Sequence, residues 1–195
     1  MVTLLVGMMF STVTVAAHQA AMNFTSLLFM MPLSISMALT IVVGFEVGGN
    51  RLTDAKEYSR FGVVSAIGII AVASIFLFFF RERIASFYSD NPEVITLAKQ
   101  FLIFAIFYQL SDAAQASLQG VLRGYKDVTV PFITALISYW GVGIPAGYGL
   151  ASFTTLGPFG FWLGITIGLT CASLGFLARL RVIQKRVIAK AAEQP

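Results

Sequence analysis

Long apolar stretches separated by short polar clusters restrict the fold of this chain more than any other feature of its sequence. Hydropathy predicts six spans, at Met1–Ala17, Phe24–Phe45, Phe61–Phe80, Leu97–Leu122, Val130–Leu150 and Phe159–Leu180. A helix needs about 20 apolar residues to cross a bilayer, and only helices or closed barrels satisfy their backbone hydrogen bonds in lipid. We therefore expect an all-α membrane protein with six transmembrane helices in residues 1–180, followed by a basic cytoplasmic tail in residues 181–195.

The composition excludes several functional classes. Charged residues make up 11% of the 195 residues, and 57% are hydrophobic, whereas a soluble domain carries about 25% charge. The net charge of +4 comes mostly from the carboxy-terminal tail, so it does not indicate a nucleic-acid partner. HExxH, GxSxG and P-loop motifs are missing, and one histidine with one cysteine is too little for a metal site. We expect a non-enzyme without a cofactor, whose first partner is the lipid bilayer.

The first predicted span is shorter than the others. About 17 residues lead from Met1 to His18, and no charged residue precedes them. A first helix normally has a polar anchor on its near side, so we expect this helix to begin upstream of Met1. His18 itself falls in the predicted turn 18–23, where it is either a hydrogen-bonded anchor or a group that titrates near neutral pH.

Cations are distributed unevenly over the predicted connections. Ten lie in Gly48–Arg60, in Arg123–Asp127 and in the carboxy-terminal segment from Arg179 onward, whereas two, Arg81 and Arg83, lie on the opposite side. Positively charged connections stay on the cytoplasmic side of a membrane. With six spans, both the amino end and the carboxy end are then expected in the cytoplasm.

Small residues and prolines recur within the predicted spans. Gly160, Gly164, Gly168 and Ala172 recur every four residues, as do Gly143 and Gly147. Such stripes let helices approach closely in lipid. Pro32 and Pro145 lie inside spans, where each indicates either a packing kink or a hinge beside a transport cavity.

Asp112 is the one charged residue in the middle of a span. The nearest cations in sequence, Lys99 and Arg123, are more than ~15 Å away along a helix axis. A lone carboxylate at this depth costs roughly 2.5–3.5 kcal/mol on insertion scales, so it usually faces a cavity. Tyr108, Asp112, Gln115 and Gln119 are spaced by four, three and four residues, which places them on one helix face.

Two interpretations of this polar stripe compete. In one, Asp112 is protonated and forms a structural contact with a neighbouring helix, worth about 0.6 kcal/mol. In the other, its carboxylate exchanges a proton or a sodium ion for a cationic solute. No lysine or arginine lies near the middle of any predicted span to neutralise it, which favours the second interpretation. Tyr139 and Trp140 are either interfacial aromatic residues or part of the same cavity.

Five segments together resemble a known family. They are AAHQAAMNFTSLLFMMPLSI, VVGFEVGG, YQLSDAAQASLQGVLRGYKD, ALISYWGVGIPAGYGL and GFWLGITIGL, in this order. In sequence and spacing they are similar to the carboxy-terminal lobe, helices 7–12, of a NorM-type multidrug and toxic compound extrusion (MATE) transporter.

The resemblance implies a twelve-helix antiporter of two lobes in the bacterial plasma (inner) membrane, which exports organic cations or drugs in exchange for Na⁺ or H⁺. In this family a tyrosine and an aspartate four residues apart on the tenth helix belong to the cation site, which corresponds to Tyr108 and Asp112. Gln115 and Gln119 would add polar contacts, and Asp112 would be the Na⁺ ligand of a sodium-coupled pump. The acidic partner on the seventh helix and the whole amino-terminal lobe would lie upstream of Met1.

Two alternatives to a transporting lobe remain at this stage. The first is that the chain is a truncated, non-transporting fragment of such a transporter, and the second is a related flippase. A related lipid-linked oligosaccharide flippase shares the broader architecture, but it would place several arginines in its cavity, and none lies near the middle of any predicted span.

Overall fold

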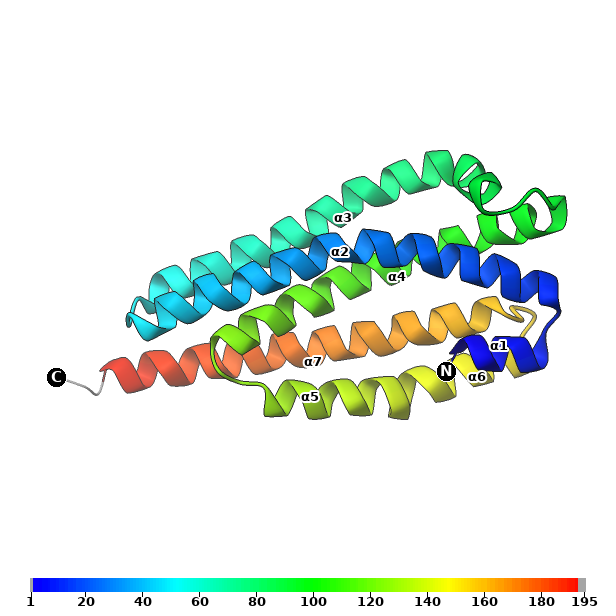
Figure 1. Ribbon diagram of the computed structural model, residues 1–195. Coiled ribbons are helices and arrows are strands. Elements are labelled where there is room, and N and C mark those ends of the chain that lie inside the picture. Colours follow the sequence, from blue (N-terminus) through cyan, green and yellow to red (C-terminus); the bar gives the residue numbers. More distant parts are fainter. Residues whose placement is uncertain (1, 193–195) are drawn as a thin grey trace.

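The computed structural model describes residues 2–192, which fold into a bundle of helices without a β-strand in that range (Figure 1). The helices are α1 (Val2–Met9), α2 (Thr12–Gly48), α3 (Leu52–Tyr88), α4 (Pro92–Gly124), α5 (Thr129–Leu136), the π-helix η1 (Ile137–Gly143), α6 (Ile144–Phe153) and α7 (Phe159–Ala192). Helices α5, η1 and α6 follow one another without a break. The all-α prediction is confirmed.

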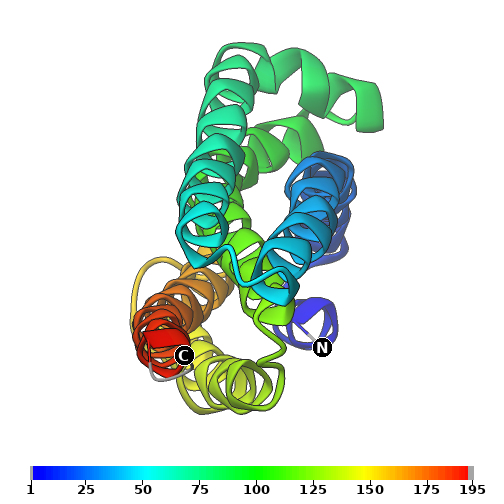
Figure 2. The ribbon, with the colours of Figure 1, turned by 90° about the vertical axis from the view of Figure 1, so that its left-hand side faces the viewer.

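Five helical segments of the described chain are long and apolar enough to cross a membrane. They are α2, α3, α4, the continuous segment Thr129–Phe153, and α7. Helix α4 packs against α2, α3 and α7 and therefore forms the centre of the bundle (Figure 2). The segment from α5 to α6 lies along α7 on the outer side.

The first two predicted spans have the wrong boundaries. Helix α2 begins at Thr12, where the Ser11 side chain accepts a hydrogen bond from the Thr14 backbone N–H, and it continues through His18 and Asn23 without a turn. Hydropathy assigned these polar residues to a loop, but His18 is fully buried and hydrogen-bonded inside the bundle. Helix α1 has only 8 residues, or about 12 Å, which is too short to cross a bilayer.

The cation-rich segments gather at one end of the molecule. The α2–α3 turn, the α4–α5 turn and the last turns of α7 lie together there, at the left of Figure 1. We call this the basic end. The α1–α2, α3–α4 and α6–α7 connections lie at the other end. The predicted grouping of the cation-rich connections on one side is therefore confirmed.

Glycines allow α6 and η1 to lie directly against α7. A Cβ atom at Gly164 would overlap the backbone of Gly147 and approach the Gly143 carbonyl, and a Cβ at Gly160 would overlap Ala151. The predicted small-residue stripe thus forms a helix interface. The π-helix ends at Gly143, just before Pro145, which has no N–H to continue the α-helical hydrogen bonds. Pro32, in contrast, lies inside an unbroken α2.

Two ion pairs stabilise the turns of the basic end. Arg51 pairs with Glu46 across the α2–α3 turn, and this hydrogen-bonded carboxylate raises the pKa of the guanidinium. Arg179 of α7 donates from Nε to the Asp127 carboxylate at 2.6 Å. The Asp127 side chain is only 10% exposed, so this second pair fastens the α4–α5 turn to α7.

Arg179→Gln is expected to lower the free energy of unfolding by about 1–2 kcal/mol, because a hydrogen bond to a charged group is lost and Asp127 is left largely buried without its partner. Arg186→Gln, an exposed position on the same helix, should stay within about 0.5 kcal/mol of the parent. Thermal unfolding of the detergent-solubilised chain measures both. Equal stability of the two variants would show that the Arg179–Asp127 pair does not hold the turn.

Candidate functional site

Hydrogen bonds to α2 fix one side of the central helix α4. Gln109 Nε2 donates to the Thr25 carbonyl at 3.0 Å. About two and three turns further along α4, the Ser36 hydroxyl donates to the Ala116 carbonyl at 2.7 Å and the Thr40 hydroxyl to the Gly120 carbonyl at 3.0 Å. A Cβ atom at Gly120 would overlap the backbone of Ser36, so the two helices are nearly in backbone contact.

A second set of polar contacts fixes the side of α4 that faces α7. The Ser111 and Thr170 hydroxyls are 3.0 Å apart, and the Ser173 hydroxyl donates to the Ser111 carbonyl at 3.3 Å. These contacts lie at the level of Asp112. The rotation of α4 about its own axis is therefore set from two sides, and with it the direction in which the polar stripe faces.

The structure buries the middle of the predicted stripe and separates its ends. Asp112 is 6% exposed and Gln115 is 7% exposed. Tyr108 is partly buried and packs edge-on against Trp162 of α7, with 5.7 Å between ring centroids. Gln119 lies about 10 Å from Asp112 along the axis, where it lines a separate hollow at the basic end with Arg123 and Asp127.

Asp112 has no countercharge within the described part of the chain. The ion pairs there join Glu46 to Arg51, Glu82 to Lys99 and Asp127 to Arg179. The electrostatic neighbours of the carboxylate are instead two phenols, Tyr108 one turn before it on α4 and Tyr139 on η1. The spacing on α4 predicted the first phenol, but not the second, which comes from another helix.

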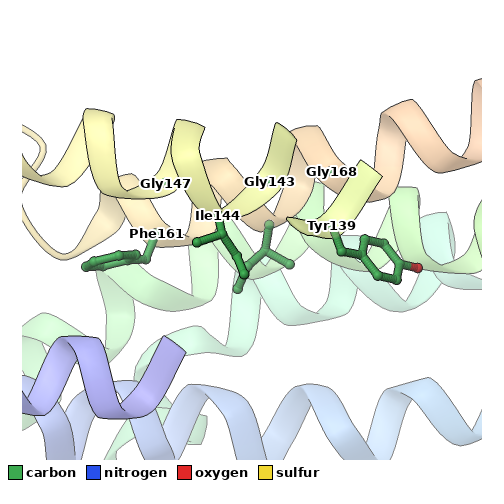
Figure 3. A pocket seen from close by; sticks show the side chains of 7 residues that line it. Tyr139, Gly143, Ile144, Gly147, Phe161 and Gly168 are labelled. Atoms are coloured by element: carbon green, nitrogen blue, oxygen red, sulfur yellow. The ribbon is translucent and has the colours of Figure 1, made fainter. Parts of the chain in front are cut away.

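A small cavity adjoins Tyr139, between η1 and α6 on one side and α7 on the other (Figure 3). Its volume is about 170 Å³. Three glycines and four larger side chains line it: Tyr139, Gly143, Ile144, Gly147, Phe161, Ile165 and Gly168. In Figure 3 the Tyr139 hydroxyl points away from Phe161 and Ile144. The wall is otherwise apolar, so this cavity suits the apolar part of a ligand. Trp140, in contrast, is 60% exposed on the outside.

Trp162, on which the Tyr108 ring packs, belongs to a buried hydrogen-bond network. The Trp162 indole N–H donates to His18 Nδ1 at 3.1 Å, and His18 Nε2 lies 3.3 Å from the Thr3 hydroxyl. Because Nδ1 accepts, the proton of a neutral His18 lies on Nε2 and is donated to Thr3. His18 and Trp162 are 144 residues apart in sequence, so no local pattern pointed to this contact.

Gln109 is a polar residue that sequence analysis missed. Its side chain is fully buried, and its Oε1 atom has no hydrogen-bond partner among the described residues. It lies three residues before Asp112, on the adjoining face of α4. Sequence analysis did not include Gln109 in the stripe. In the structure its side chain faces α2, where it donates to the Thr25 carbonyl.

A sodium ion would need ligands besides the single carboxylate of Asp112. Among residues 2–192, no group of three histidine, cysteine or acidic side chains converges on a metal-binding position. A sodium ion at Asp112 would therefore add hydroxyl, carbonyl or amide oxygens to the single carboxylate, and these are ligands that hard cations accept. Of the described residues, Tyr108 and Tyr139 are the hydroxyl-bearing candidates.

Comparison with known proteins identifies the family. The sequence profile of the MatE family matches residues 1–149. The chain is 56% identical over 179 residues to the "Probable multidrug resistance protein NorM" of Oceanobacillus iheyensis and 52% identical over 177 residues to that of Bacillus subtilis. These alignments cover 92% and 91% of this chain but 40% and 39% of the relatives. The chain thus spans about 40% of the length of its relatives.

Solved structures agree in fold. The eukaryotic MATE transporter AtDTX14 superposes with a TM-score of 0.81 at 22% identity, covering 90% of this chain and 41% of that one. An inward-facing multidrug resistance MATE family transporter superposes with a TM-score of 0.76 at 19% identity, covering 93% and 41%. The chain therefore belongs to the MATE family of transporters and folds as one lobe of such a protein.

Proposed function

We propose that the chain is the carboxy-terminal lobe of a multidrug efflux antiporter, which exports organic cations in exchange for Na⁺ or H⁺. The single observation that carries this proposal is the buried, uncompensated carboxylate of Asp112 beside two phenols. The names of the relatives, which concern multidrug resistance, support it.

The geometry suits alternate occupation of one site. A buried carboxylate without a fixed cation is stabilised when a mobile cation or a proton neutralises it. The Tyr108 and Tyr139 rings present negative π faces and hydroxyl oxygens, both of which attract an organic cation. Occupation by the coupling ion would remove this attraction and release the drug.

The other lobe is the expected partner. In our proposal it closes the site from the side opposite α4, and a carboxylate on the helix that α1 continues assists Asp112. The basic end would face the cytoplasm of a bacterium, because cation-rich connections are retained there.

The coupling ion can be tested in a hybrid transporter, the Oceanobacillus iheyensis relative with its aligned segment replaced by this chain. Everted vesicles containing the hybrid are loaded with a fluorescent cationic dye under a Na⁺ gradient alone or a pH gradient alone. Dye transport driven by one gradient and insensitive to the other identifies the ion. Transport that neither gradient accelerates, from a hybrid that inserts normally, would refute antiport.

The 195-residue chain expressed alone is the matched control for that assay. Because the proposed site needs the other lobe, the chain alone should insert without moving dye. Efflux by the chain alone would show that its own residues complete the site.

A further inference from the structure

A groove at the basic end lies between the beginning of α3 and the end of α7. The two helices contact each other over only a short stretch, and both reach the basic end, where α3 begins and α7 ends (Figure 1). The groove has a volume of about 580 Å³. It lies at the opposite end of α7 from Trp162 and is separate from the cavity beside Tyr139.

Four cations line the two walls of this groove. Lys56 and Arg60 are one turn apart on α3, and Arg181 and Lys185 are one turn apart on α7. All four side chains are exposed. None forms an ion pair within the described residues, and no acidic residue lines the groove there. Four like charges held together in this way repel one another unless an anion lies between them.

The inner part of the groove is apolar. Val64 of α3, Leu118 of α4 and Leu177 of α7 line it on the side of the bilayer centre. Two neutral polar side chains, Ser59 and Gln184, lie at the level of the cations. The groove thus presents cations at the membrane surface and hydrocarbon-like walls below them, which is the polarity profile of a phospholipid.

We propose that this groove is a binding site for an anionic phospholipid of the same leaflet. The phosphate lies between the α3 and α7 cation pairs, and the acyl chains descend along Val64, Leu118 and Leu177. Basic pockets between transmembrane helices on the cytoplasmic side are suited to such headgroups. A soluble phosphate compound would gain the charge contacts but leave the apolar wall uncovered, so the lipid is the occupant that both features fit.

The lipid would connect α3 to α7, which share few contacts of their own. At this end of the lobe, the association of α3 with α7 would then depend on whether the lipid is bound. This role is independent of the chemistry at Asp112, because the groove shares no residue with the polar stripe.

Native mass spectrometry of the purified hybrid, titrated with dioleoyl phosphatidylglycerol, tests the site. Removal of the α7 pair in R181Q/K185Q, or of the α3 pair in K56Q/R60Q, should weaken phosphatidylglycerol binding about thirtyfold, since each surface cation contributes about a factor of five. The matched control is K126Q/R186Q. It removes the same charge from exposed positions at the same end, outside the groove, and should change binding less than about threefold.

Competition distinguishes the lipid from a soluble anion. Glycerol 3-phosphate in large excess should leave bound phosphatidylglycerol in place, and phosphatidylcholine should bind as weakly to the parent as to the variants. Equal loss in the control pair would show diffuse surface attraction and overturn the proposal. Displacement by glycerol 3-phosphate, or undiminished binding in both groove variants, would overturn it as well. None of these readouts depends on efflux, so failure here leaves the proposed function untouched.

Discussion

Asp112→Asn in the hybrid transporter is expected to abolish ion-coupled efflux, with a fall on the order of a hundredfold or more in the rate of dye export. Loss of one charged partner in a desolvated site costs roughly 2–5 kcal/mol, and about 1.4 kcal/mol corresponds to a factor of ten. Asparagine keeps the size of the side chain and removes only its charge and its ability to exchange a proton. The packing of α4 against α2 and α7 should therefore survive.

The comparison variant is Asp90→Asn, which makes the same chemical change in the α3–α4 connection, at the opposite end of the bundle from the basic end. Export should be unchanged in that variant. Dye export in everted vesicles, normalised to the amount of inserted protein, is the measurement. If Asp112→Asn exported dye at the parent rate, the carboxylate would be a structural contact and the proposed cation site would be wrong. If Asp112→Asn inserted poorly, dye binding to the solubilised protein would still separate loss of charge from loss of fold.

The sequence predicted what depends on local patterns. Spacing along one helix was enough to place Tyr108 and Asp112 on one face, and hydropathy was enough to find the long apolar helices. Charge counting grouped the cation-rich connections correctly, since it depends only on the order of the spans. The first two signals each lie within one helix, and the third needs only the order of the spans, so no knowledge of tertiary contacts was needed.

The errors come from contacts between distant segments. Hydropathy reads His18 as a polar residue that ends a span, but the Trp162 indole satisfies it inside the bundle. Burial of a hydrogen-bonded polar group costs little, so α2 continues through the predicted turn. Sequence analysis left Tyr139 open as an interfacial residue or part of the cavity, because its electrostatic influence on Asp112 comes from η1, whose position relative to α4 depends on how both pack on α7. Gln119 lines the hollow at the basic end, and its contribution to the cation site stays a prediction.

Gly164→Ala is expected to destabilise the lobe by about 1–3 kcal/mol, the usual cost of adding a methylene to a closely packed interface. The added methyl group would overlap the Gly147 backbone, which cannot rotate away as a side chain can. Helix α7 must therefore move away from α6 and η1. This movement would also widen the cavity beside Tyr139, because Gly143, Gly147 and Gly168 line it.

Gly149→Ala is the matched control, because a Cβ atom at Gly149 meets nothing within 4 Å. An alanine inside a helix is favoured over glycine by roughly 0.5–1 kcal/mol, so this variant should equal or exceed the parent in stability. Unfolding of the purified hybrid in increasing denaturing detergent measures both free energies. The two variants carry the same substitution, and helix propensity favours alanine at both positions. Opposite signs for their changes in the free energy of unfolding would therefore assign the cost at Gly164 to backbone contact. If Gly164→Ala were as stable as Gly149→Ala, the glycine stripe would not be what brings α7 against α6.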